Sequence, residues 1–349
     1  MQKISDFINH ALFHPTEGYY RTKNPIGKNS DFITAPEISQ VFGEILAAYF
    51  LQISSTKKSP IAFVEMGAGK GTLFGDILGA IKKLAEKNIA PAVDFINRAT
   101  FHIIEINPVL QKIQQENLRQ FTVNWSENFS NFISQNPNKE IFFLSNELFD
   151  CYAIDQFVLT EMGWRERMIA DKKFVLADFD KKIHNFVEQE INALAPIGVV
   201  FEYSFAAREF MKQLCEALKT QGGIAINIDY GYIKNQFANT LQALKNHQKV
   251  DVLENPGEAD ITSLVDFASL QKIVQNHDLD SSLISQKEFL IGLGIEQRRK
   301  VLIEKNPAKE SEINSAIDRL IDSSQMGDLF KCLIIWSRHE DGMTSGFFI

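Results

Sequence analysis

The segment IAFVEMGAGKGT, residues 61–72, constrains the fold of this chain more than any other stretch. Four apolar residues predict a short buried strand that ends at an acid, and a helical pattern begins after three alternating glycines. Glycines lack Cβ, so the backbone of such a turn can approach a flat ligand closely. The segment therefore predicts a strand, a tight turn and a helix N-terminus that bind a nucleotide-type cofactor through Glu65, Gly67, Gly69, Gly71 and Thr72.

The spacing of the glycines favours one cofactor. A dinucleotide fingerprint is G-x-G-x-x-G, with the pyrophosphate at the helix N-terminus, whereas this turn is G-x-G-x-G and follows Glu65. A carboxylate there repels a pyrophosphate but suits the amino group of S-adenosylmethionine. The β-rich segment 100–106 closes with Glu105 and Ile106, where the acid can accept both ribose hydroxyls. S-adenosylmethionine is therefore the expected cofactor; NAD is the alternative, and a turn that serves only strand–helix packing is a third interpretation.

Composition argues against several classes of protein. The 349 residues suit one large domain or a core with a substantial insertion, and 45% apolar with 23% charged residues is ordinary for a globular protein. A net charge of −8 argues against binding to a nucleic-acid backbone. The cysteines and histidines show no metal-binding spacing, so no metal is expected. No apolar run reaches membrane-spanning length and the N-terminus lacks a signal pattern, which favours a cytoplasmic protein without membrane insertion.

Strand and helix patterns alternate from residue 61 to residue 146, and this rhythm predicts a doubly wound α/β fold with a parallel sheet. The expected core strands are 61–66, 100–106, 121–125, 140–146, 224–228 and 329–336, with the last one at the sheet edge. Short strands that predict an antiparallel insertion are 156–160, 164–170 and 173–179. Late helical patterns are 265–277, 288–305 and 308–321.

These patterns divide the chain into seven expected parts. They are an N-terminal helical lid segment (1–60), the first part of the core (61–150), an antiparallel insertion (151–200), a core continuation (201–235), a helical substrate-side insertion (236–324), a final core strand (325–340) and a tail (341–349). The ligand is expected where the parallel strands end.

Polar residues follow the predicted strand 140–146, at the edge where a doubly wound sheet binds its ligands. Asn146, Glu147 and Asp150 stand there, and the two carboxylates are three residues apart. Such a pair can grip the planar donor fork of one guanidinium and hold its charge beside a methyl donor. A structural role fits the pattern equally well, because Asn and Asp are common helix caps.

The segment SDFITAPEISQ, residues 30–40, is a second polar cluster. Thr34, Glu37 and Gln40 are expected to belong to a lid over the cofactor and to contact the substrate. Pro36 and Glu37 also fit the ordinary rules for a helix start, and spacing does not separate the two interpretations.

The chain after residue 224 offers further substrate-side candidates. Strand 224–228 ends in Asp229 and Tyr230, which are expected to contact the substrate. His247 is the remaining candidate, although such a histidine is more often a surface or packed residue.

Together these segments resemble the family of S-adenosylmethionine-dependent protein methyltransferases that includes the mitochondrial complex I assembly factor 7. The resemblance runs nearly end to end and rests on HPTEGYY (14–20), SDFITAPEISQVFGE (30–44), VEMGAGKGTL (64–73), SNELFDCYAIDQF (145–157), INIDYGY (226–232), NTLQALKNH (239–247), ENPGEADITSLVDFASL (254–270), FLIGLGIEQR (289–298) and MGDLFKCL (326–333). The combination of DFITAPEISQ and NPGEADIT is its most specific part. The resemblance implies a seven-stranded Rossmann-like methyltransferase core with S-adenosyl-L-methionine as cofactor.

The resemblance also implies an activity. The family's studied eukaryotic member, a protein of the mitochondrial matrix, symmetrically dimethylates an arginine in a core complex I subunit. The bacterial equivalent of that quinone-site subunit is therefore the candidate protein substrate. By position, the three glycines would line the cofactor, Glu105 would hold its ribose, and Asn146, Glu147 and Asp150 would face the methyl-transfer site.

Two other functions stay open at this point. One is an assembly chaperone that binds S-adenosylmethionine without turnover, and the other is a small-molecule or nicotinamide enzyme on a similar fold. A homodimer is also open, since the apolar helical segments 41–50 and 265–275 could pack in the core or at a dimer face.

Overall fold

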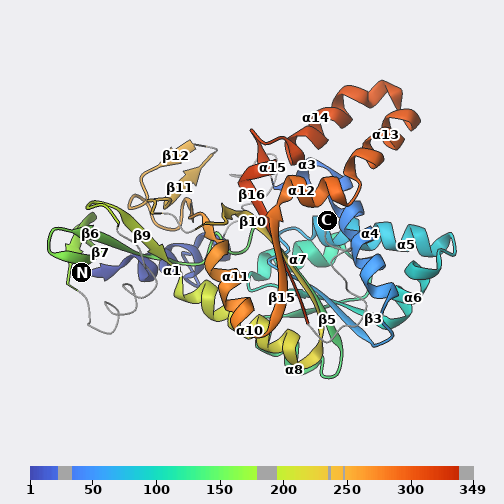
Figure 1. Ribbon diagram of the computed structural model, residues 1–349, viewed down its shortest axis with the longest axis horizontal. Coiled ribbons are helices and arrows are strands. Elements are labelled where there is room, and N and C mark those ends of the chain that lie inside the picture. The colour runs from blue at the N-terminus through green and yellow to red at the C-terminus, as the bar shows by residue number, and fades with distance from the viewer. Residues whose placement is uncertain (23–33, 179–194, 235–236, 247, 338–349) are drawn as a thin grey trace.

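The computed structural model describes residues 1–22, 34–178, 195–234, 237–246 and 248–337. At its centre is a sheet whose main strands lie in the order β15-β16-β10-β5-β2-β3-β4 (Figure 1). These strands are β2 (Ile61–Met66), β3 (Ala99–Ile104), β4 (Val123–Ser126), β5 (Glu140–Asn146), β10 (Gly223–Tyr232), β15 (Leu279–Ser285) and β16 (Phe330–Ser337). Only β16 runs antiparallel to its neighbours within this path. The predicted doubly wound α/β fold is thereby confirmed.

Apolar side chains of the central strands alternate between the two faces of the sheet. In β2, Phe63 belongs to one buried cluster and Val64 to the other. The first cluster is completed by α4 (Gln40–Ser55), α5 (Thr72–Glu86), α6 (Ala90–Arg98) and α12 (Gln286–Gly292), and the second by α8 (Phe129–Gln135), α10 (Phe205–Gln221) and α11 (Phe267–Asn276). Ring centroids of Phe50 and Phe74 lie 4.8 and 5.1 Å from that of Phe63, so these phenylalanines pack the core as expected.

One core strand was missed by the sequence prediction. The insertion 236–324 was expected to be helical, but β15 lies within it and joins the core sheet as the outermost strand. As a result β16 lies between β10 and β15, and the prediction that it forms the sheet edge is wrong. β15 reads LDSSLIS and is mostly half-buried, so it carries little local strand signal; it is held by pairing with the apolar β16.

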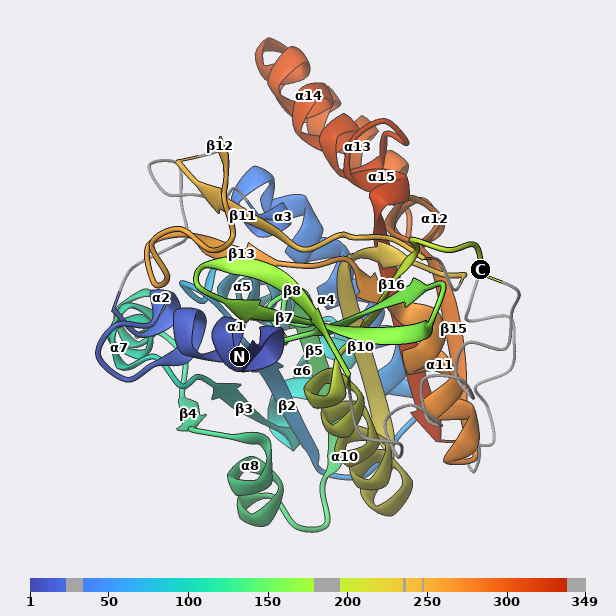
Figure 2. The ribbon, with the colours of Figure 1, turned by 90° about the vertical axis from the view of Figure 1, so that its left-hand side faces the viewer.

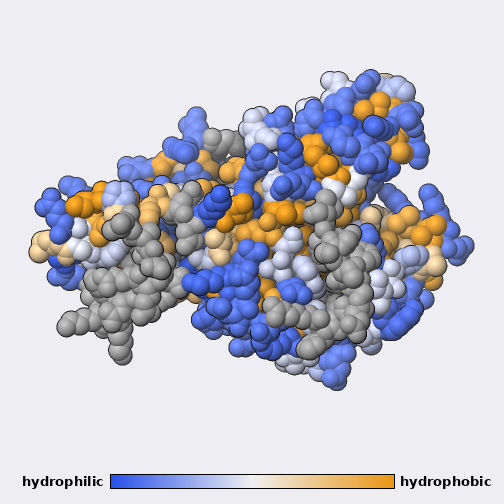
Figure 3. All heavy atoms as spheres, in the orientation of Figure 1, coloured by the Kyte–Doolittle hydropathy of each residue, from blue (hydrophilic) through white to orange (hydrophobic). Residues whose placement is uncertain are grey.

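The late helices follow the predicted segments with one break. α11 and α14 (Glu310–Ile321) lie where helices were predicted. The segment 288–305 instead forms two helices, α12 and α13 (Ile295–Lys305), because Gly294 adopts φ = +90° between them. α13 and α14 project from the body of the molecule (Figure 1, Figure 2). Hydrophilic residues cover most of this projection on the face seen in Figure 3.

An antiparallel sheet forms the other end of the molecule, on the left in Figure 1. Its strands β6 (Asp155–Thr160), β7 (Gly163–Ala170) and β8 (Lys173–Ala177) confirm the predicted antiparallel insertion. β9 (Val200–Tyr203) also pairs into this sheet, so the insertion extends past the boundary predicted at residue 200. The sheet further includes β1 (Gln2–Lys3) from the N-terminal segment.

The N-terminal segment connects this sheet with the core. α1 (Ile4–Phe13) packs against the antiparallel sheet and the short β13 (Asp260–Thr262), which pairs with β11 (Gln242–Lys245). α2 (Tyr19–Thr22) contacts α7 (Pro108–Asn117), and α3 (Ala35–Ile38) contacts α4 and α5. The segment therefore lies beside the ends of the core strands. Within the described ranges, no helix combines the length and the apolarity needed to cross a bilayer.

Candidate functional site

The glycine turn lies between β2 and α5, where the sequence predicted it. Gly67, Gly69 and Gly71 all have positive φ, at 73°, 55° and 77°, and Gly71 forms the N-cap of α5. A Cβ on Gly67 would lie 3.0 Å from Cδ1 of Leu148, which a larger residue would crowd. The turn lines a cavity together with Thr34, Pro36, Glu37, Asn146 and Glu147. The structure thus brings the predicted cofactor turn next to the predicted catalytic residues.

Glu65 is the acid that precedes this turn and also lines the cavity. Only 2% of its surface is exposed, and within the described part of the chain its Oε2 has no hydrogen-bond partner. Burial raises the pKa of the carboxyl to about 8, and the nearby Glu105 charge adds to this. A buried acceptor without a partner is costly, so this atom is suited to an ammonium group in the cavity.

Glu105 follows β3 and is tied to the glycine turn by a glutamine that the sequence analysis did not single out. Its Oε1 accepts the backbone N–H of Asn107 at 2.8 Å, and its Oε2 accepts Nε2 of Gln114 at 2.9 Å. Gln114 also donates to the carbonyl of Gly69 at 2.8 Å and accepts from Nε1 of Trp125 at 3.0 Å. Gln114 therefore fixes the distance between the acid and the turn. Gln114 lies in a helix of mostly polar residues, so its position in the sequence did not indicate this role.

Ile106 follows Glu105 with 42% of its surface exposed. Its carbonyl oxygen accepts a hydrogen bond from Nη1 of Arg21, at the end of α2. Burial raises the pKa of Glu105, while its own hydrogen bonds and the Arg21 charge lower it. The second candidate acid is thus held by protein donors from two segments.

The loop after β5 positions Asn146 and Glu147 at the cavity. Glu147 has φ = +54°, which is uncommon for a residue with a side chain. Its carboxylate accepts Nδ2 of Asn146 at 3.1 Å and a backbone hydrogen bond from Ala35. Loss of water and the nearby Asp150 charge raise the pKa of Glu147 to about 8 despite these bonds. Oδ1 of Asn146 has no partner among the described residues.

Asp150 completes this loop and is 7% exposed. Its Oδ2 accepts the hydroxyl of Tyr230, while Oδ1 has no partner in the described ranges. Burial raises the pKa of Asp150 to about 6, and the Tyr230 bond lowers it. The loop therefore presents two unpartnered side-chain oxygens, one on Asn146 and one on Asp150.

Asp229 was predicted to face the substrate, and the structure gives it another task. It is fully buried, and its Oδ2 accepts the backbone N–H groups of Phe149 and Asp150 at 2.8 and 3.1 Å. Its Oδ1 accepts the backbone N–H of Tyr230 at 2.8 Å. The Asp229 carboxylate thus anchors the backbone of the loop, whereas the hydroxyl of its neighbour Tyr230 contacts the side chain of Asp150.

The 34–40 cluster divides between the cavity and the surface. Oε1 of Glu37 accepts Oγ1 of Thr72 at 2.8 Å, which joins the N-terminal segment to the first turn of α5. Thr34 and Glu37 line the cavity, whereas Gln40 is exposed and lines a groove along α5 that shares Thr72 with the cavity. The lid and substrate contact predicted for Gln40 stays a prediction. His247 lies outside the described residues.

A tyrosine–carboxylate pair beside Asp150 was not predicted. The hydroxyl of Tyr20 donates to both oxygens of Asp260, at 2.9 and 3.0 Å. The Asp150 charge contributes to raising the pKa of Tyr20, as does Cys151, so all four lie in one cluster. Lys70, on the glycine turn, is the cation that lines the cavity and was likewise not singled out.

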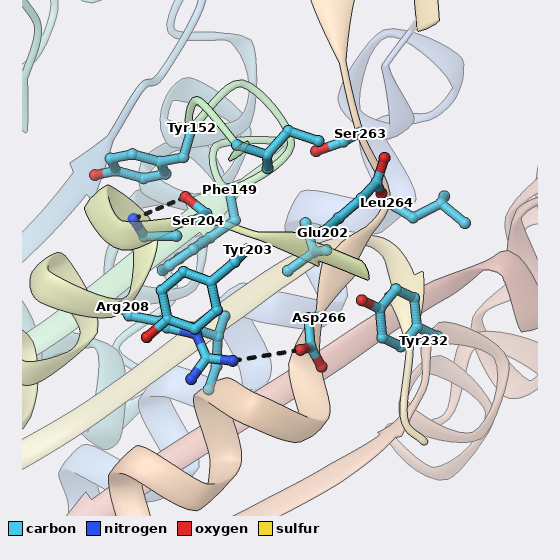
Figure 4. Close-up of a pocket in the computed structure, with 14 residues that line it drawn as sticks. Phe149, Tyr152, Glu202, Tyr203, Ser204, Arg208, Tyr232, Ser263, Leu264 and Asp266 are labelled. Carbon is cyan, nitrogen blue, oxygen red and sulfur yellow. Dashed lines mark hydrogen bonds and ion pairs between the residues drawn. The ribbon is translucent and has the colours of Figure 1, made fainter. Parts of the chain in front are cut away.

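A second hollow lies behind this loop, between β9, α10 and the start of α11 (Figure 4). Its charged groups have partners within the protein. The guanidinium of Arg208 lies 3.9 Å from the centroid of the Tyr203 ring and 3.6 Å from a carboxylate oxygen of Asp266. Glu202 accepts three hydrogen bonds from the Thr240–Leu241 segment. This hollow is electrostatically satisfied by the protein, whereas the cavity at the glycine turn is not.

Known proteins share this arrangement. Residues 43–284 match a family described as "Putative S-adenosyl-L-methionine-dependent methyltransferase". The chain is 30% identical to the mitochondrial protein arginine methyltransferase NDUFAF7 of Danio rerio, over 94% of this chain and 82% of that protein. The Homo sapiens protein of the same name is 29% identical, over 94% of this chain and 78% of its own length.

Solved structures give the same result for the fold. A protein from Burkholderia thailandensis, crystallised with bound S-adenosyl-homocysteine, superposes with a TM-score of 0.83 at 26% identity, covering 99% of this chain and 90% of that one. A native structure of a protein of the same superfamily and organism gives a TM-score of 0.79 at 26% identity, covering 97% and 88%. The cofactor expected from the glycine turn is therefore the one used by this family.

Proposed function

Because the chain belongs to the S-adenosyl-L-methionine-dependent methyltransferase family, we propose that its methyl acceptor is an arginine side chain of a protein. One observation carries this proposal. Asn146 and Glu147 line the cavity at the glycine turn, and their loop, 146–150, carries two buried oxygens without a partner among the described residues, Oδ1 of Asn146 and Oδ1 of Asp150. A guanidinium offers five N–H donors in one plane and carries the positive charge that such acids favour.

The cavity residues fit the cofactor. Glu65 offers its unpartnered Oε2 to the amino group, and Lys70 offers a cation to the carboxylate. Glu105 is tied to the turn through Gln114, and each of its oxygens retains a lone pair for a ribose hydroxyl. When bound, S-adenosylmethionine supplies a methyl group on a positively charged sulfur. The task of the protein is to hold the acceptor nitrogen in line with that methyl and to exclude water.

Glu147 and its neighbours would orient the acceptor. Asn146 and Ala35 already hold the Glu147 carboxylate from one side, so its position is set before the acceptor arrives. A guanidinium charge nearby favours the ionised form of Glu147 and opposes the effect of burial. We expect the acid to become fully ionised only with the cation in place.

The identity of the client is part of the proposal. The similarity to proteins named protein arginine methyltransferase NDUFAF7 supports an arginine substrate, and the family resemblance suggests a core complex I (NADH dehydrogenase) subunit near the quinone site. A cytoplasmic location, with the client in the same compartment, and a homodimer stay predictions from the sequence. The relatives named here are mitochondrial by name.

Mass spectrometry of respiratory-complex subunits, from cells with and without this protein, tests the proposal directly. We expect one arginine to lose its methyl groups when the protein is absent. A strain carrying Glu147→Gln should give the same loss, while Glu116→Gln, the same change at an exposed position of α7, should not. Unchanged arginine methylation in the absence of the protein would refute the assigned client.

The same variants separate methyl transfer from chaperoning. If Glu147→Gln abolishes methylation but the respiratory complex still assembles, the two roles are separable. If the purified protein binds S-adenosylmethionine and its client but transfers no methyl group, the chaperone function is the correct one. Methylation of a small molecule with no protein acceptor would instead indicate a small-molecule methyltransferase.

A further inference from the structure

We infer that Asp150 is the group that takes the proton from the attacking nitrogen, and that Tyr230 is its positioning residue. This inference rests on the proposed arginine methyltransfer and assigns different tasks to the two acids of the loop. Glu147 orients and holds charge, whereas Asp150 receives the proton through its unpartnered Oδ1.

The first support is the way in which Asp150 is fixed. Its backbone N–H donates to Asp229, and its backbone carbonyl accepts the N–H of Ser263 at 3.2 Å. Its Oδ2 accepts the Tyr230 hydroxyl, which sets the plane of the carboxylate. Besides these three anchors, the carboxylate has one further oxygen, Oδ1, which is buried and has no hydrogen-bond partner among the described residues. A buried acceptor of this kind is costly unless a ligand donates to it.

The second support is the contrast with Glu147. The Glu147 carboxylate accepts two hydrogen bonds, from the Asn146 side chain and the Ala35 backbone. Asn146 lines the cavity, and Ala35 lies between the lining residues Thr34 and Pro36. Their hydrogen bonds stabilise the ionised form of Glu147 and fix the orientation of its carboxylate. Within the described ranges Glu147 has no buried side-chain oxygen without a partner, unlike Asp150. Its carboxylate is therefore suited to orient a cation, and Oδ1 of Asp150 is the oxygen left to accept a proton.

The surroundings of Asp150 contain several other titratable groups. They are Glu147 on the same loop, Cys151 next in the chain, Asp229 and Tyr230 on β10, Tyr20 on α2 and, beyond Tyr20, Asp260 on β13. Burial raises the pKa of Asp229 well above its ordinary range, and the charges of Asp150 and Glu147 add to this. No lysine or arginine is among these groups. The positive charge that the cluster lacks is the one that a guanidinium brings.

The reaction balances with these groups alone. The acceptor nitrogen forms a bond to the methyl carbon as the carbon–sulfur bond breaks and its electron pair stays on sulfur. The nitrogen then carries one proton more than the stable methylguanidinium, and that proton passes to Oδ1 of Asp150. No oxidant, reductant or metal is required.

The test compares two tyrosines on the same strand. Tyr230→Phe removes the hydroxyl that lowers the pKa of Asp150, so the acidic limb of kcat against pH should move upward by about 1 on the pH scale. Activity at pH 6 should then fall several-fold more than activity at pH 8. Tyr232→Phe is the matched control, because Tyr232 lines the second hollow (Figure 4) and its loss should leave the profile unchanged. The KM for the arginine peptide should change little in either variant.

A second measurement does not depend on turnover. Calorimetry of an arginine peptide binding to the protein with S-adenosyl-homocysteine, repeated in buffers of different ionisation enthalpy, gives the number of protons released. Near pH 7 the Tyr230→Phe variant should release more protons than the wild type, since more of its Asp150 starts protonated. Asp150→Asn should remove the part of this release that comes from Asp150 and leave the part that comes from Glu147. It should keep S-adenosyl-homocysteine binding and lower kcat by about 100-fold or more.

The outcomes separate the inference from the proposed function. If the wild type methylates arginine and Tyr230→Phe shows the wild-type pH profile and proton release, the inference is overturned while the function stands. If the wild type transfers no methyl group to any arginine peptide, the proposed function itself fails. A moved limb in Tyr230→Phe with an unmoved limb in Tyr232→Phe supports the assignment.

Discussion

Replacing Glu65 with glutamine separates two effects of the buried carboxylate: it lowers the stability of the fold, and it contributes to binding of the cofactor. In the folded protein, burial raises the pKa of Glu65 to about 8, against an ordinary value of 4.5. Between these values the folded chain holds a proton that the unfolded chain has released, so the free energy of unfolding falls as pH rises. At about 1.4 kcal/mol per pH unit, the loss reaches about 3 kcal/mol at pH 7 and about 5 kcal/mol above pH 8.

Glutamine does not ionise, so the Glu65→Gln variant should escape this loss. Its amide has two N–H donors, one more than the protonated acid has, and the extra donor without an acceptor subtracts a constant of about 1–2 kcal/mol at every pH. The stability of the variant relative to the wild type should therefore grow by about 1.4 kcal/mol for each pH unit between roughly pH 5 and pH 8. Urea unfolding across this range measures the slope. Glu86→Gln, at an exposed position of α5, is the control and should show no such slope.

Cofactor binding should change in the opposite sense. The variant loses a charge-assisted hydrogen bond to the amino group, which is worth about 1.5–3 kcal/mol, or roughly 10- to 150-fold in Kd. S-adenosyl-homocysteine carries the same amino group, so its titration calorimetry gives this ratio without turnover. The reasoning is refuted if the variant binds that ligand as tightly as the wild type, or if its stability follows the wild-type pH dependence.

Two further predictions concern the hydrogen bonds of Gln114 and the contact between helices α4 and α5. Gln114→Leu removes the link between Glu105 and the turn, and it should weaken S-adenosyl-homocysteine binding by about 10-fold or more in calorimetry while the chain stays folded. Gly43→Ala should lower the free energy of unfolding by about 1–3 kcal/mol, because its Cβ would lie 2.6 Å from Cβ of Asp76. Gly79→Ala meets nothing within 4 Å and should raise it by about 0.5–1 kcal/mol, so urea unfolding of the pair checks the contact.

The parts of the fold that could be predicted are those with a local signal. The run before Glu65 is apolar because β2 is covered on both faces. The glycines that follow have positive φ, which is the backbone conformation that glycine favours, so the residue types alone predicted this turn. β15 carries no such signal, since its half-buried serines fit a strand only next to β16. The break at Gly294 was missed for a related reason. A glycine within an apolar helical pattern can continue a helix or end it, and tertiary contacts decide.

The candidate site was predictable to the same extent. Asn146, Glu147 and Asp150 were found because they follow one strand directly, and the structure brings all three together. Gln114 and Tyr20 were missed because their partners are distant in the chain: Tyr20 and Asp260 are 240 residues apart. No spacing rule relates such positions. The prediction for Asp229 named the right residue, but whether its carboxylate faced a ligand or the backbone depended on the loop that it holds.

The burial that forms this site also decides which ligands it can hold. Removal of water raises the pKa of Glu65 and Glu147 to about 8 and that of Asp150 to about 6. A neutral ligand would leave the first two acids largely protonated at neutral pH and would gain little from them. A cation favours their ionised forms, so binding and proton release are linked. The amino group of the cofactor and the guanidinium of the acceptor are two such cations. An isosteric but neutral acceptor, such as a urea in place of the guanidinium, would gain no attraction from an ionised Glu147 and should bind weakly even where its shape fits.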